Sequence, residues 1–90
     1  MKQIEIIVSG KVQGVYYRHY TCKQADKLGI VGYVQNLVNG DVKIVAQGEE
    51  FQLDQLITWA KSSSPNAQVD NLQWKAIENI EPFSQFTVRY

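Results

Sequence analysis

The stretch IEIIVSGKVQGVYYRHYTCKQADKLG, residues 4–29, gives the clearest indication of the fold of this chain. Apolar residues alternate over residues 4–8, which is the period of a strand with one buried face. A helical pattern follows over residues 17–28 and ends at Gly29, where glycine tolerates the positive φ that closes many helices. The sequence therefore predicts a strand and a helix joined by a short turn that contains two glycines.

Arg18 lies at the start of this expected helix, directly after the glycine turn. The N–H groups of such a turn, the positive end of the helix dipole and the guanidinium all direct positive charge at one spot. We therefore predict an anion site, and a phosphoryl group fits it best. From the turn alone, an ordinary tight turn with a solvated arginine is an equally good interpretation.

The rest of the chain alternates between strand and helix patterns. Asn39-Gly40 is a strong hairpin signal, because both residues tolerate positive φ. After Gly48, apolar residues at i, i+3, i+4 and i+7 predict a second helix with one buried stripe, and a serine-rich connection follows. We expect the stripe at Leu53, Leu56, Ile57 and Ala60, the connection at residues 62–66, and further strands at residues 30–37, 42–47, 69–77 and 86–90.

The predicted order is β-α-β-β-α-β with a short C-terminal strand. Two β-α-β crossovers that share a central hairpin predict an α+β fold, the ferredoxin-like sandwich. Right-handed crossovers place both helices on one face of an antiparallel sheet. We expect residues 1–90 to form a single domain.

Composition excludes several classes of function. Nine basic residues balance nine acidic ones, which argues against a general nucleic-acid binder. No apolar stretch approaches the roughly 20 residues that span a bilayer, and no signal peptide is evident. The single cysteine, Cys22, rules out an intramolecular disulfide and suits a reducing compartment. We expect a cytoplasmic monomer with no membrane or nucleic-acid partner.

Asn36 is the second candidate site residue, late in the second strand and, in this topology, near the start of the first helix. A neutral amide beside an anion site can hold a water with one donor and one acceptor. The ordinary alternative is an asparagine bonded to its own backbone. We expect His19 on the surface and Cys22 in the core, with no cluster of ligands for a metal.

Taken together, these motifs resemble the acylphosphatase family. The match begins with GKVQGVYYR at residues 10–18, continues through LGIVGYVQNLVNGDV at residues 28–42, and closes with Phe86, Val88 and Tyr90. It spans essentially the whole chain. The resemblance implies the same ferredoxin-like sandwich and the hydrolysis of small acyl phosphates to a carboxylate and inorganic phosphate, with no cofactor.

The resemblance also implies roles for individual residues. Arg18 matches the family's phosphate-binding arginine, and Asn36 matches the asparagine that positions the attacking water. Inorganic phosphate, as the product, is expected to compete with the substrate, and no metal is required. The implied phosphate-binding loop comprises Gly10, Lys11, Val12, Gln13, Gly14, Val15, Tyr16 and Tyr17.

Two other functions fit the same fold. RNA-binding modules stack bases on aromatic residues of the two central strands, but the strands at residues 4–8 and 42–47 contain none. A regulatory or maturation module could keep the fold and lose turnover. Because both Arg18 and Asn36 are present, we favour a standalone enzyme.

Overall fold

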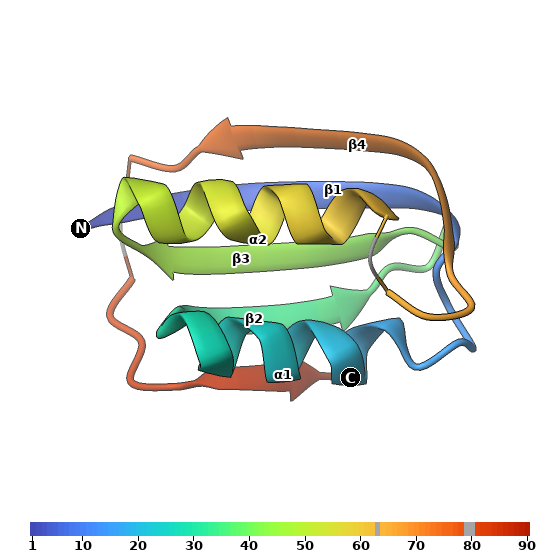
Figure 1. The fold of residues 1–90 in the computed structure, drawn as a ribbon, viewed down its shortest axis with the longest axis horizontal. Helices are drawn as coiled ribbons and strands as arrows, with labels where there is room; N and C mark the ends of the chain where they lie inside the picture. The colour runs from blue at the N-terminus through green and yellow to red at the C-terminus, as the bar shows by residue number, and fades with distance from the viewer. Residues whose placement is uncertain (63, 79–80) are drawn as a thin grey trace.

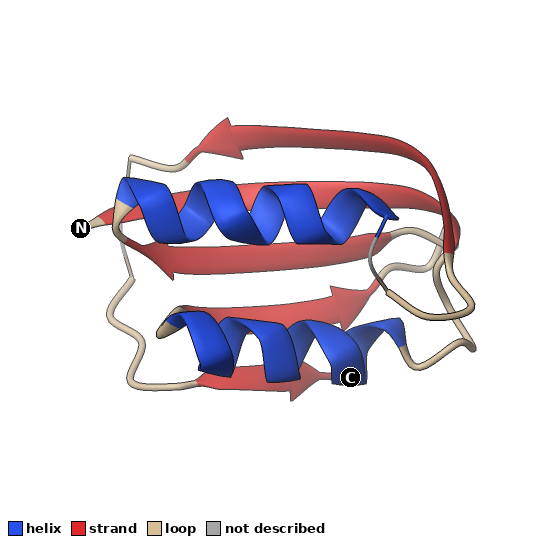
Figure 2. Cartoon of the chain, viewed as in Figure 1, coloured by secondary structure: helices blue, strands red, loops and turns tan. Residues whose placement is uncertain are grey.

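The computed structural model describes residues 1–62, 64–78 and 81–90. Two helices cover one face of a five-stranded sheet whose strand order is β4-β1-β3-β2-β5 (Figures 1 and 2). This is the predicted α+β ferredoxin-like sandwich. Its elements are β1 (Lys2–Lys11), α1 (Tyr17–Leu28), β2 (Val31–Asn36), β3 (Val42–Gly48), α2 (Glu50–Ser62), β4 (Gln68–Ala76) and β5 (Phe86–Arg89).

Every predicted element is present, with ends displaced by one or two residues in most cases. Of the connection predicted over residues 62–66, residue 63 lies outside the described residues. No helix in the described part of the chain is long and apolar enough to cross a membrane.

The last strand departs from the predicted antiparallel sheet. β5 pairs with β2 in parallel, with Phe86 opposite Gly32, whereas the β1–β3, β1–β4 and β2–β3 pairs are antiparallel. β5 runs in the same direction as β2 and enters from the same end of the sheet (Figure 1). This pairing brings the C-terminus to the start of α1.

A β-bulge interrupts the pairing of β1 with β4 just before the glycine turn. Ser9 lies opposite Asn71 and Gly10 opposite Val69, so Asp70 is an extra residue on β4. Gly10 has a φ of 127°, and a Cβ there would collide with the main-chain oxygen of Gln68. The bulge therefore needs a glycine at this position, and it shifts the alternation of side chains along β4 by one residue.

The core fills the space between the sheet and the two helices. The predicted stripe of α2, from Leu53 to Ala60, is buried as expected. On α1 the buried residues are Tyr17, Thr21 and Ala25, whereas Cys22, which was predicted in the core, is half-buried. The Tyr17 hydroxyl donates a hydrogen bond to the carbonyl of Ala60 at 2.8 Å. Because the hydroxyl has this partner, the whole Tyr17 side chain can be buried.

Tyr17 thus ties the start of α1 to the end of α2. Its ring also packs against Trp59, with ring centroids 5.9 Å apart. Burial raises the pKa of the Tyr17 phenol far above its ordinary value, so the hydroxyl stays protonated as a donor. This contact fixes the first turn of the helix that carries Arg18.

On the other face of the sheet, the aromatic residue of β2 is covered by its neighbours. Tyr33 of β2 points to this face but is 8% exposed. The Arg89 guanidinium lies 3.7 Å from the centre of its ring, and Phe83 packs against its edge. Base stacking of the kind found in RNA-binding modules is therefore blocked at this tyrosine.

Candidate functional site

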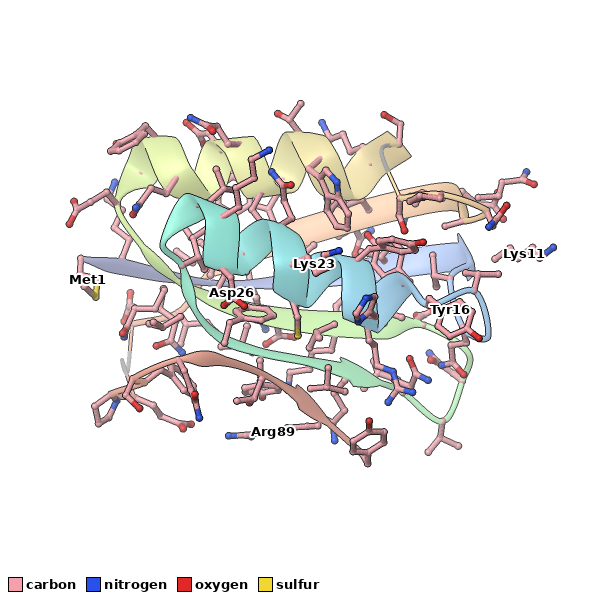
Figure 3. All side chains as sticks on the ribbon, turned by 60° about the horizontal axis from the view of Figure 1, so that its bottom comes forward. Met1, Lys11, Tyr16, Lys23, Asp26 and Arg89 are labelled. Carbon is pink, nitrogen blue, oxygen red and sulfur yellow. The ribbon has the colours of Figure 1, made fainter. Side chains whose placement is uncertain are left out.

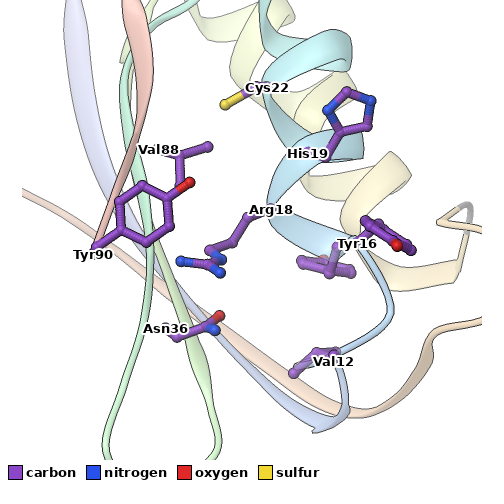
Figure 4. Close-up of a pocket in the computed structure, with 10 residues that line it drawn as sticks. Val12, Tyr16, Arg18, His19, Cys22, Asn36, Val88 and Tyr90 are labelled. Atoms are coloured by element: carbon purple, nitrogen blue, oxygen red, sulfur yellow. The ribbon is translucent and has the colours of Figure 1, made fainter.

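A pocket of about 510 Å³ opens at the end of the sheet where β1 leads into α1 (Figure 4). Its wall combines the turn, the first turns of α1, the end of β2 and the residues at the end of the chain. These segments are far apart in sequence and meet because β5 lies beside β2. The lining residues are Val12, Gly14, Tyr16, Tyr17, Arg18, His19, Cys22, Asn36, Val88 and Tyr90.

The turn between β1 and α1 has an alternating backbone. Gly14 and Tyr16 lie in the left-handed region, at φ values of 76° and 61°, and Val15 between them does not. Such alternation turns successive N–H groups toward one side and forms a concavity that binds anions. Within the described part of the chain, the N–H groups of residues 13–19 donate no hydrogen bond. They are available to a ligand.

The backbone conformation of Tyr16 in this turn is energetically unfavourable. The left-handed conformation disfavours a residue with a side chain by roughly 1–2 kcal/mol. Tyr16 is also the N-cap of α1 and supplies no side-chain cap to the helix, and its own side chain is 76% exposed. Strain of this kind persists where the surroundings impose it, and it is common at sites that bind ligands.

The Arg18 side chain points into the pocket toward Asn36 (Figure 4). Its Cζ lies 4.9 Å from the centre of the Tyr90 ring, within the range of a cation–π contact. Its Nη1 makes one long hydrogen bond, 3.5 Å, to the carbonyl of Arg89. Among the described residues no carboxylate pairs with Arg18, since the ion pair found there joins Lys2 and Glu50. Most guanidinium donors can therefore meet an anion.

Asn36, the last residue of β2, lines the same pocket and has one side-chain atom without a partner. Its side-chain oxygen, Oδ1, is buried and accepts no hydrogen bond from the described part of the protein. A buried polar atom without a partner costs about 1–3 kcal/mol. Such atoms in folded proteins call for an explanation, and a role in binding or catalysis is one of them.

Gln13 has a function that the sequence did not reveal. Its side-chain amide crosses to the β2–β3 hairpin and donates to the carbonyls of Leu37, at 2.8 Å, and Asp41, at 2.9 Å.

The hairpin was predicted at Asn39-Gly40 and is present, but only Gly40 of that pair has a positive φ. Its three-residue loop is closed by Leu37 N–H donating to the Asp41 carbonyl at 2.8 Å.

Other residues of the predicted loop lie outside the pocket. Gly10 and Lys11 belong to β1, and Figure 3 shows Lys11 at the outer end of the strand, pointing away from the protein. Gln13 and Val15 are half-buried and do not line the pocket. The loop that faces the pocket is therefore shorter than the predicted one.

His19 and Cys22 both line the pocket. His19 is exposed as predicted, but it forms part of the rim. Cys22 is half-buried rather than a core residue, and burial, reinforced by the charge of Asp26, raises the pKa of its thiol. A thiol held in its protonated form is a poor nucleophile.

Val88 and Tyr90 were not predicted as pocket residues. The alternation at the end of the chain indicated only a strand, and the parallel pairing that delivers both residues to Arg18 is a tertiary feature. No Asp or Glu side chain lines the pocket. Among the described residues no group of three His, Cys, Asp or Glu side chains could hold a metal ion. The positive charge in the pocket comes from Arg18, the loop amides and the helix dipole.

Comparisons with known proteins find similar sequences and structures over nearly the whole chain. The family model described as Acylphosphatase matches residues 4–88. A curated acylphosphatase of Archaeoglobus fulgidus is 47% identical over 90 residues, covering 100% of both chains. The crystal structure of an acylphosphatase from Bacillus subtilis superposes with a TM-score of 0.95 at 34% identity, covering 100% of both chains. A full-length HypF structure matches with a TM-score of 0.92 at 26% identity, over 99% of this chain and 12% of that one.

Proposed function

The chain belongs to the acylphosphatase family, and from this premise we propose that Arg18 binds the phosphoryl group while Asn36 orients the attacking water. The relatives are acylphosphatases, which are hydrolases that act on acyl phosphates. We propose small acyl phosphates as the substrates here. The products are a carboxylate and inorganic phosphate.

Binding of the phosphoryl group follows from the positive charge in the pocket. The loop N–H groups and the N-terminus of α1 meet two or more phosphoryl oxygens, as at other helix N-termini that bind phosphate. Arg18 adds a planar fork of donors that matches these oxygens in a bidentate way. Because these groups are in place before substrate arrives, they stabilise the charge of the transition state without reorganisation.

The attacking water is assigned to Asn36. Its Oδ1 accepts a hydrogen bond from the water and directs the oxygen lone pair at phosphorus, opposite the acyl oxygen. The new bond joins the water oxygen to phosphorus, and the bond from phosphorus to the acyl oxygen breaks. The carboxylate leaves with the electron pair. The proton passes to a phosphoryl oxygen of the substrate, since no Asp or Glu side chain lines the pocket to act as a base.

One observation carries the proposal: Arg18 lines the same pocket as Asn36, whose Oδ1 has no hydrogen-bond partner within the described part of the protein. An acceptor and a cation side by side suit a reaction between water and an anion. We further propose a cytoplasmic monomer, because one chain supplies the whole pocket and a single cysteine suits a reducing compartment.

Inorganic phosphate is expected to inhibit competitively, and prolonged treatment with EDTA is expected to leave turnover of benzoyl phosphate unchanged. The physical reason is that arginine and amides supply the charge that a metal would otherwise provide. Steady-state kinetics with and without both reagents provide the test. Loss of activity that a divalent ion restores would contradict the proposal, and so would phosphate inhibition that excess substrate does not relieve.

A further inference from the structure

We propose that Gln13 is a positioning residue that fixes Asn36 relative to the phosphate-binding loop, an inference that rests on the function proposed above. Gln13 belongs to the turn that would hold the phosphoryl group. Its side chain, however, reaches the hairpin that begins directly after Asn36. The turn would bind the phosphoryl group, and Asn36, just before the hairpin, would orient the water. The Gln13 side chain therefore joins the two segments that hold the reactants.

The contact uses both hydrogens of the Gln13 amide. Nε2 donates to the Leu37 carbonyl and to the Asp41 carbonyl, 24 and 28 residues away in sequence. Two bonds from one planar amide define a direction as well as a distance, because both acceptors must lie near its plane. A single hydrogen bond would leave the hairpin free to rotate about it.

The two carbonyls are also the ones that close the hairpin. The Asp41 carbonyl accepts from Leu37 N–H at 2.8 Å, and the Leu37 carbonyl accepts from Gly40 N–H at 3.2 Å. Each carbonyl therefore keeps a main-chain donor if the Gln13 amide is removed. The hairpin is expected to form without Gln13, and what is lost is its attachment to the loop.

The attachment of the hairpin to the loop sets the position of Asn36. Asn36 precedes Leu37 directly, and its Oδ1 is held by no hydrogen bond within the described part of the protein. The position of the Asn36 side chain therefore depends on its backbone, which Gln13 holds against the turn. Because in-line attack tolerates little displacement, a shift of about 1 Å in such a group can cost about 10²-fold in rate.

The test compares Gln13→Met with Gln52→Met. Methionine has nearly the length of glutamine but no amide and no charge. Gln52 is a matched control, because its side chain also makes two hydrogen bonds to main-chain groups, with Glu49 and Leu28, each 2.8 Å long. It lies at the start of α2, outside the pocket wall, so its loss reports on stability alone.

Gln13→Met is expected to lower kcat for benzoyl phosphate by about 10- to 100-fold. The phosphate inhibition constant is expected to change by less than about threefold, because Arg18 and the helix N-terminus remain. Gln52→Met is expected to retain the wild-type kcat. Gln13→Asn keeps the amide but falls short of the carbonyls by roughly one carbon–carbon bond, about 1.5 Å, and is expected to behave like Gln13→Met.

A double variant separates positioning from a general structural effect. If Gln13 acts through Asn36, then in the Asn36→Ala background Gln13→Met lowers kcat by less than about threefold further. Equal losses in both backgrounds would overturn the inference, as would a wild-type kcat in Gln13→Met and Gln13→Asn. A wild-type kcat in the single variant Asn36→Ala would instead refute the water-orienting role, and this inference with it.

Discussion

Arg18→Ala is expected to lower kcat/KM for benzoyl phosphate by at least about 10³-fold, the range in which an arginine stabilises a phosphoryl transition state. It is also expected to abolish inhibition by inorganic phosphate. The guanidinium is held by Tyr90 and by the carbonyl of Arg89, and it points into the pocket with most of its donors unused. Steady-state kinetics and the phosphate inhibition constant measure both effects.

Two further variants define what Arg18 contributes. Arg18→Lys keeps the charge but loses the planar fork, and we expect it to remain badly impaired. Lys23→Ala removes one positive charge from an exposed position on the same helix, outside the pocket wall, and should leave the kinetics unchanged. Near-native turnover in Arg18→Ala would contradict the assignment of the phosphoryl site.

Asn36→Ala is expected to lower kcat and kcat/KM together by about 10²- to 10³-fold, as does loss of one preorganised polar group elsewhere. The phosphate inhibition constant should change little. The physical reason is that Oδ1 is an acceptor, which meets water in the transition state and gives nothing to an anion in the ground state. The measurement is the pair of constants, kcat and the inhibition constant, for each variant.

Asn71→Ala serves as the control for this substitution. Asn71 is an exposed asparagine of β4 that does not line the pocket, so its loss should affect neither constant. If Asn36→Ala weakened phosphate inhibition as much as Arg18→Ala does, Asn36 would be a binding residue. The water-orienting role would then be wrong.

Most of the fold was predictable, because hydrophobic periodicity reports directly on which face of an element is buried. The stripe of α2 is the clearest example, since its four predicted residues are all buried. The bulge at Gly10 and the parallel pairing of β5 were not predictable. Both depend on how strands meet in space, and the alternation of apolar residues along one strand carries no information about its partner.

Some residues of the candidate site could likewise be predicted from the sequence, and others could not. Arg18 and Asn36 could be selected because their side chains have the chemistry that an anion and a water need, and the pocket brings them together. The hydrogen bonds of Gln13 could not be foreseen, because they join residues 24 and 28 positions apart. Tyr90 was likewise hidden, since its contact with Arg18 depends on the position of β5.

Hydrolysis in water enriched in ¹⁸O shows directly whether water attacks the phosphorus of the group that Arg18 and the loop hold. Because the water oxygen forms its new bond to phosphorus, one label should appear in inorganic phosphate and none in the carboxylate. Mass spectrometry of both products after a single round of hydrolysis distinguishes the two. Label in the carboxylate would show that water attacks the acyl carbon, and would contradict the account.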